Sequence, residues 1–421
     1  MELTQRIKQR LREVEDWTAV MDEIQAEAEG ADDKAEQSKA LFELGRVCEG
    51  FFLDKARAMD CYQRAFKLDQ RNVAALRHAR TIYQEMAHLQ MVTKLMGLEI
   101  KLNQDDSLIP RLNYDMGLAL LNQGKVDESK QMLGIAAGAD PEFAGRFQEV
   151  LYDRAAWEAS LEAIDDQLCD QTGEDDPLAA NVVNKGPVLS ALYLRAARIL
   201  QQEAPQDERL LPLLFKALDA DPSNDEAGFI AEVMLHEGGH LQHIQKLQDR
   251  RVANTEDPAE KLRLLRQFAN VWQVRLNNPE MAAYFTHQAL EQAYSTGSFG
   301  EGESSWHVAA FRSLVEQADA LGNADALVTL AQRGLMVIED TTDAALVGLL
   351  AGRLAWRKFG DLDTARSFFV QAFETAPQHP VIKAFLDEVG PLDTGVMADE
   401  VATPEPEAEA EPEAEPEPEA E

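Results

Sequence analysis

The stretch NYDMGLALLNQGKVDESKQMLGIAAGADPEF (113–143) decides the fold, because its small and large residues follow the pattern of two packed helices. Small Gly117 in the first half allows a second antiparallel helix to approach closely, and large Leu133 with small Ala136 in the second half fills the space. Gly124 permits a tight turn between the helices, since glycine adopts positive φ at little steric cost. Pro141 is expected to end the second helix, because proline cannot continue it.

The same pattern recurs along the chain. It is found in YQRAFKLDQRN (62–72), LGIAAGADPEF (133–143), LFKALDADPSN (214–224) and FVQAFETAPQH (369–379), and more weakly in THQALEQAYST (286–296). The central alanines of successive copies are 71, 81, 72 and 83 residues apart. That period is about twice the roughly 34 to 40 residues of a two-helix repeat, so each unit is predicted to be a pair of helical hairpins. The repeat positions are Gly45, Ala58, Tyr62, Ala65, Gly117, Gly124, Ala136, Pro141, Ala217, Pro222, Ala282, Ala289, Gly360, Ala365, Phe369, Ala372 and Pro377.

The pattern strongly resembles the tetratricopeptide repeat (TPR), most clearly at 113–143, and HEAT-like or half-repeat variants give a similar pattern. The resemblance implies an all-α fold, a right-handed α-solenoid of TPR-like helical hairpins over residues 1–390. A soft domain boundary is expected at a long loop, 166–187. Residues 391–421 are predicted to be a disordered tail, because their Pro/Glu/Ala composition cannot bury a core.

Charge guides the expectation about partners. The chain has a formal net charge of −35, and 11 of its acidic residues lie between Asp399 and Glu421, where no basic residue occurs. Such a balance predicts no binding to nucleic acid or to anionic membranes, since both require a basic face. A protein or peptide partner of basic or mixed charge is expected instead. The tail is either a solubiliser or an electrostatic tether for such a partner.

The remaining features predict a cytoplasmic protein. The 3 cysteines are scattered and form no CxxC pair, which favours a reducing compartment over a disulfide framework. The N-terminal stretch MELTQRIKQRLREVEDW has no apolar segment of a signal peptide. The longest apolar run, around Ala344–Ala351, is too short to span a bilayer.

One motif points to catalysis. His236-Glu237-Gly238-Gly239-His240 has the H-E-x-x-H spacing of zinc peptidases, in which both histidines bind zinc from one face of a single helix. However, the two glycines are a helix-stop signal, and the alignment of 83–95 with 235–247 places the motif on a turn between two helices. We therefore expect no metal, no cofactor and no catalytic residue, with a zinc hydrolase using His236 and His240 as the alternative.

The resemblance to TPR proteins implies a binding function on the concave surface of the array. First helices of TPR hairpins contribute the binding side chains, which here are Phe42, Arg46, Arg111, Tyr114 and Leu118. The Lys and Asn of the TPR subtype that binds acidic C-termini are replaced by Tyr114 and Leu118, so that clamp is not expected. The predicted function is a non-catalytic adaptor or scaffold, and the alternative is a permanent structural subunit of a larger complex. Either kind of protein is compatible with an oligomer of this chain.

Overall fold

The computed structural model describes residues 3–103, 105–179, 186–300, 305–322 and 324–392. Within these ranges the chain forms twenty-one α-helices and no β-strand, and successive helices pair as antiparallel hairpins. The predicted all-α solenoid of helical hairpins is thus confirmed. None of the described helices is long and apolar enough to cross a membrane.

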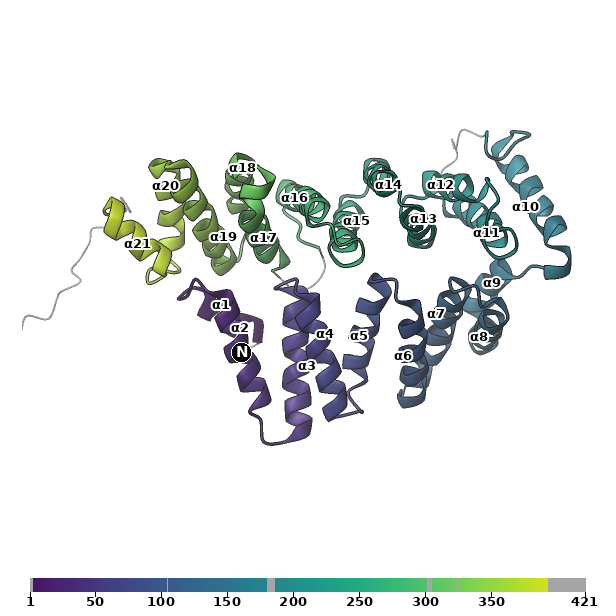
Figure 1. The fold of residues 1–421 in the computed structure, drawn as a ribbon, viewed down its shortest axis with the longest axis horizontal. Coiled ribbons are helices and arrows are strands. Elements are labelled where there is room, and N and C mark those ends of the chain that lie inside the picture. Colours follow the sequence, from purple (N-terminus) through teal and green to yellow (C-terminus); the bar gives the residue numbers. More distant parts are fainter. Residues whose placement is uncertain (1–2, 104, 180–185, 301–304, 323, 393–421) are drawn as a thin grey trace, which may run out of the picture.

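The helices form two rows that lie alongside each other (Figure 1). The first row is α1 (Leu3–Leu11), α2 (Trp17–Glu29), α3 (Lys34–Gly50), α4 (Lys55–Leu68), α5 (Val73–Glu85), α6 (Leu89–Leu102), α7 (Ile109–Leu121), α8 (Val126–Ala139) and α9 (Pro141–Val150). At the end of this row α10 (Trp157–Thr172) leads into the second row, in which the chain runs back towards its start.

The second row is α11 (Pro187–Glu203), α12 (Leu210–Ala220), α13 (Asp225–Glu237), α14 (Leu241–Asn254), α15 (Pro258–Asn270), α16 (Pro279–Thr296), α17 (Trp306–Leu321), α18 (Ala324–Leu335), α19 (Thr341–Leu354), α20 (Leu362–Phe373) and α21 (Pro380–Val389). Two π-helical turns, η3 (Val271–Arg275) and η4 (Ala355–Phe359), follow α15 and α19. Contacts of α1 with α19 and of α9 with α11 join the rows near both ends.

Many of the acidic and amide side chains begin helices. The Asp33 carboxylate, for example, accepts hydrogen bonds from the backbone amides of Ala35 and Glu36, which have no partner inside α3. The N-cap residues of this kind include Asp16, Asp33, Asp54, Asn72, Asp257, Asn278, Asp340 and Asp361. Part of the negative charge therefore stabilises the short helices of the array.

The hairpins pack through small residues on the first helix. The close pairs are Gly45 with Tyr62, Gly117 with Leu133, and Gly352 with Phe369. A Cβ atom on Gly117 would lie 2.6 Å from Cγ of Leu133, closer than carbon atoms can approach. Gly124 has φ of +75° in the turn, as the sequence predicted. The small and large positions of 113–143 thus have the packing role expected from the sequence.

One four-helix unit occurs twice. In α3–α6, Ser38 Oγ donates to the Ala65 carbonyl at 2.8 Å, and the Asn72 amide donates to Ser38 Oγ at 3.0 Å. In α11–α14 the equivalent residues are Ser190, Ala217 and Asn224, with the same 27- and 34-residue separations. Because each asparagine also caps the next helix, it fixes one hairpin against the following one.

Three details of the sequence prediction need comment. Residues 166–187 are not wholly a loop, because α10 continues to Thr172 and Gly173 ends it with φ of +73°. Pro141 does not simply end α8, since it is the first residue of α9, after the capping Asp140. Residues 393–421, most of the predicted tail, lie outside the described residues, so the division at 390 stays a prediction.

The glycine contact can be tested by adding one methyl group. We expect Gly117→Ala to lower the free energy of unfolding by about 1–3 kcal/mol, because the methyl group overlaps Leu133. The matched control is Gly138→Ala in α8, where an added Cβ meets no atom within 4 Å. The control should gain about 0.5–1 kcal/mol from higher helix propensity. Urea unfolding measures both, and equal effects of the two substitutions would contradict the packing described.

Candidate functional site

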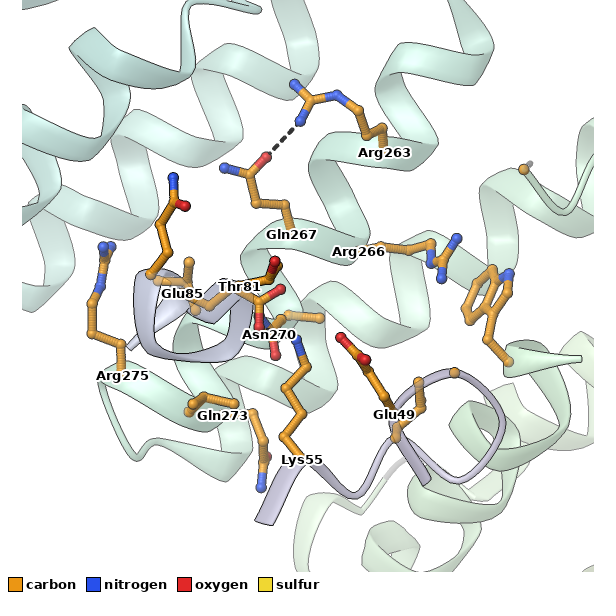
Figure 2. Close-up of a pocket in the computed structure, with 18 of the residues that line it drawn as sticks. Glu49, Lys55, Thr81, Glu85, Arg263, Arg266, Gln267, Asn270, Gln273 and Arg275 are labelled. Atoms are coloured by element: carbon orange, nitrogen blue, oxygen red, sulfur yellow. Dashed lines mark hydrogen bonds and ion pairs between the residues drawn. The ribbon is translucent and has the colours of Figure 1, made fainter. Parts of the chain in front are cut away.

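A cavity of about 1560 Å³ lies between the two rows. The first row contributes residues of α1, α3, α5, α6 and α7 to its wall, and the second row contributes residues of α13, α15, η3, α16 and α17. Figure 2 shows side chains from both rows pointing into this space. The cavity is therefore a product of the doubled-back array, since neither row alone encloses it.

The wall from the second row is centred on α15. Its polar residues Arg263, Arg266, Gln267 and Asn270 are spaced three and four positions apart, so they share one helical face, which lines the cavity. The opposite face of α15 is buried and apolar, with Leu264, Leu265 and Phe268 in the core. Leu262 is also buried, but it lies at the edge of the polar face and lines the cavity. The amphipathic pattern of α15 thus positions the polar wall.

The π-helical turn η3 extends this wall, and a chain of hydrogen bonds between buried side chains holds η3 in place. Nε1 of Trp272 donates to Oε1 of Gln248 at 2.6 Å, and the Gln248 amide donates to Glu232 at 2.8 Å. Glu232 also pairs with Arg275, which lines the cavity beside Gln273. Because Trp272, Gln248 and Glu232 are all buried, these bonds hold the turn in one conformation.

The wall from the first row contains a hydrogen-bonded cluster of three side chains. The Tyr62 hydroxyl donates to Glu49 at 2.6 Å, and Nδ1 of His78 lies 3.0 Å from the same Glu49 oxygen. Burial by itself would raise the pKa of Glu49, but the hydrogen bonds of His78 and Tyr62 outweigh it and lower that pKa below its usual range. Glu49 and His78 both line the cavity, so this cluster places an ionised carboxylate in the cavity wall.

Carboxylates outnumber cations in the cavity wall, and nearly every cation is paired. The pairs are Arg46 with Glu43, Lys55 with Glu85, Arg111 with Asp115, Arg263 with Asp225 and Glu260, and Arg275 with Glu232. Arg266 is the exception among the described residues, because its guanidinium lies over the Trp306 ring, 4.5 Å from the centroid, and contacts no carboxylate.

α1 closes one end of the cavity. Leu3 and Thr4 line the cavity, while Lys8 on the same helix reaches α19 in the second row. Nζ of Lys8 lies 2.8 Å from Asp343 and 3.2 Å from Asp340, and the Lys8 and Asp343 side chains are only 4% and 3% exposed. Further contacts reinforce this closure: Glu15 pairs with Arg353, the Val14 carbonyl accepts a hydrogen bond from His379, and Trp17 stacks under Arg312.

The structure brings together three of the five residues predicted for the binding surface. Arg46, Arg111 and Leu118 line the cavity. Tyr114 does not, because it is buried and its ring stacks on Phe143 at 4.9 Å. Phe42 is partly buried against the rings of Tyr62 and His78 and is also absent from the cavity wall. That any of these residues binds a ligand stays a prediction.

The sequence prediction missed the polar face of α15. Residues 265–290 are a degenerate copy of the repeat, so the repeat pattern did not identify this helix as part of a binding surface. A usable signal was present, because polar residues at 263, 266, 267 and 270 alternate with the apolar positions of an amphipathic helix. The missing information was the second row lying opposite the first.

The H-E-x-x-H motif lies on a turn, as the sequence indicated. α13 ends at Glu237, Gly238 is its C-cap, Gly239 has φ of +73°, and His240 is the N-cap of α14. The two histidines therefore belong to different helices, unlike the zinc-binding pair of a metallopeptidase. Among the described residues, no group of three or more His, Cys, Asp and Glu side chains is placed to hold a metal ion.

Comparisons with known proteins give matches only among solved structures. No protein-family model matches the chain, and no curated protein does. The human IFIT1 dimer with PPP-AAAA matches at 13% identity and a TM-score of 0.25, over 86% of this chain and 78% of that chain. The human IFIT1 dimer with m7Gppp-AAAA matches at 13% identity and a TM-score of 0.27, over 86% and 77%.

These matches correct one expectation. The net charge of the chain was taken to exclude nucleic acid as a partner, yet the matched structures are complexes with the oligonucleotides PPP-AAAA and m7Gppp-AAAA. Net charge is a sum over the whole surface, whereas binding depends on the local potential of one site. The exclusion is therefore withdrawn. At this low identity and TM-score the matches assign no ligand to the present chain.

The buried pair between α1 and α19 can be tested by removing its cation. Lys8→Met leaves Asp343 buried without a counter-ion, so the free energy of opening α1 should fall by about 3–5 kcal/mol. Hydrogen exchange measured by mass spectrometry over α1 and α19 gives this value. The control is Arg6→Met on the same helix, which breaks an exposed pair with Glu27 and should cost at most about 1 kcal/mol. Unchanged protection of α1 in Lys8→Met would contradict the closure.

His307 beside this pair should make stability depend on pH. Burial, and secondly the charge of Lys8, lower the pKa of His307 from 6.5 to about 3. Between these values the unfolded chain binds a proton that the folded chain does not, so stability falls as the pH decreases from 6.5 towards 3. His307→Phe should lessen this fall by up to about 1.4 kcal/mol per pH unit. Urea unfolding between pH 4 and 7 tests this, and identical slopes for both proteins would disprove the assignment.

Proposed function

We propose that the chain is a non-catalytic scaffold that binds an extended segment of a partner protein in the cavity between the two rows. We further propose that its hairpins are tetratricopeptide repeats, for which the glycine contacts with Tyr62, Leu133 and Phe369 are the support. The observation that carries the binding proposal is the size and composition of the cavity. At about 1560 Å³ it exceeds the roughly 300–1,000 Å³ of most small-molecule pockets.

The lining favours a peptide of basic or mixed charge. Carboxylates outnumber cations, and side chains with both hydrogen-bond donors and acceptors, such as Gln267, Asn270 and Gln273, lie along the wall. Amides of this kind bind the donors and acceptors of an extended backbone. Since most lining charges are already paired, the wall is arranged before a ligand arrives, which lowers the entropic cost of binding.

The distribution of exposed apolar side chains supports a transient partner. A permanent structural subunit requires a large apolar patch on its surface. The large exposed apolar residues of the described chain are Leu53, Leu108, Ile135, Val188, Leu241, Tyr284, Met336, Phe359 and Leu362. They are distributed over both rows, on elements from the α3–α4 connection to α20, rather than gathered on one element. We therefore favour an adaptor over a permanent subunit.

The proposal is tested by selecting ligands with the cavity open and filled. The full chain is immobilised and presented with a display library of 12-residue peptides, with a 5′-triphosphate oligoadenylate as a second probe. Gln267→Trp places a bulky ring in the cavity, and Gln242→Trp places the same ring on an exposed position of α14 as the control. Circular dichroism checks that both variants fold.

We expect the selected peptides to bind the unchanged protein and Gln242→Trp equally. They should bind Gln267→Trp roughly tenfold more weakly or worse, a loss of about 1.4 kcal/mol or more. Selection of no peptide, or equal binding to all three proteins, would overturn the proposal. Retention of the oligoadenylate alone, lost in Gln267→Trp, would replace the peptide with a nucleic acid as the ligand of this cavity.

A further inference from the structure

Arg266 differs from every other cation of the cavity wall in the described part of the chain. The others form ion pairs, whereas the Arg266 guanidinium lies over Trp306 and contacts no carboxylate of the described residues. Figure 2 shows its side chain extending from α15 among the other side chains that line the cavity. Stacking occupies the flat face of a guanidinium and leaves the N–H groups at its edge available. Arg266 thus retains donors for a further partner.

The surroundings of Arg266 hold the group in place. Trp306 is buried, and its Nε1 donates to the Phe299 carbonyl at 2.8 Å, which fixes the orientation of the ring. A Cβ atom placed on Gly300 would lie 3.4 Å from Nη1 of Arg266, so the backbone at Gly300 also comes close to the guanidinium. An arginine that stacks on a fixed ring and lies beside the backbone loses little further freedom on binding a ligand.

The energetics of this position favour an anionic ligand. Burial lowers the pKa of Arg266, because it removes water from the charge and no carboxylate among the described residues offsets the loss. A carboxylate that forms a two-bond pair with the guanidinium restores that lost solvation, and the pair is stronger where water is excluded. Ala309 and Ala310 line the cavity on the same helix as Trp306 and contribute an apolar wall. An acidic group at this position can accept hydrogen bonds from the N–H groups at the edge of the guanidinium.

We propose that Arg266, stacked on Trp306, is the anchor that receives one carboxylate of the bound peptide. This inference rests on the proposed function, because it assigns a position within the peptide ligand. Elsewhere in the cavity Glu49, Glu85 and Glu260 contribute to an excess of carboxylates, so the rest of the peptide is basic or neutral. The carboxylate comes either from an Asp or Glu side chain or from the C-terminus of the partner.

Two measurements on the full chain test the anchor. In the first, the 12-residue library is presented with free and with amidated C-termini to the unchanged protein, to Arg266→Gln and to Arg357→Gln. Arg357 is a matched control, since its guanidinium lies over the Trp356 ring, 3.4 Å from the centroid, but is paired with Glu388 at 2.8 Å, outside this cavity. The second measurement titrates glutarate, a small dicarboxylate, and follows the Arg266 Nε–H resonance in arginine-labelled protein.

We expect the peptides selected by the unchanged protein and by Arg357→Gln either to carry an acidic residue at one fixed position or to bind only with a free C-terminus. Their binding to Arg266→Gln should be at least about tenfold weaker, the effect of losing a charge-assisted pair. An enriched peptide set without any acidic requirement would overturn the anchor and leave the proposed function standing. If no peptide is selected but glutarate shifts the Arg266 resonance, the proposed function is overturned and Arg266 is supported as a carboxylate-binding residue. If glutarate causes no shift, the result contradicts the role of Arg266 and does not affect the proposed function.

Discussion

Lys8 lies buried between two aspartates that follow it by more than three hundred positions in the sequence. The contact joins α1, at the start of the first row, to α19, near the end of the second row. A buried lysine requires a counter-ion, and Asp343 is equally buried, so each residue needs the other. This mutual requirement holds the first helix on the second row and turns an open array into an enclosure. The cavity, its lining and the proposals drawn from them depend on that closure.

The sequence predicted the local units well because their determinants are short-range. Gly117, Gly124 and Leu133 define one hairpin within 17 residues, and each has the predicted role in packing or turning. Tyr114 was predicted to lie on the binding surface, but the structure buries it outside the cavity wall. Its position on α7 was assigned from the repeat pattern alone, whereas α9 follows α8 and places Phe143 over the ring. The repeat pattern alone does not predict this contact between α7 and α9.

The cavity itself was beyond sequence reasoning. Its two walls come from segments separated by more than 100 residues, as Asn122 and Asp225 illustrate. No repeat in the sequence relates the two walls. The contact between Lys8 and Asp343 could not be predicted either, because the chain is acidic and offers each lysine many possible carboxylate partners. The sequence could not single out Arg266 either, because which described arginines have a carboxylate partner depends on the folded structure.

The closure of α1 on α19 is tested most directly by a distance measurement in solution. Spin labels are attached at Gln9→Cys on α1 and Thr341→Cys on α19, both exposed positions, with the partly exposed Cys169 replaced by serine. The account predicts one narrow, short distance in pulsed electron paramagnetic resonance. This distance should persist at high salt, because buried charges are screened only weakly. A broad or long distribution, or one that lengthens with salt, would contradict the account by showing that the two rows are not held together.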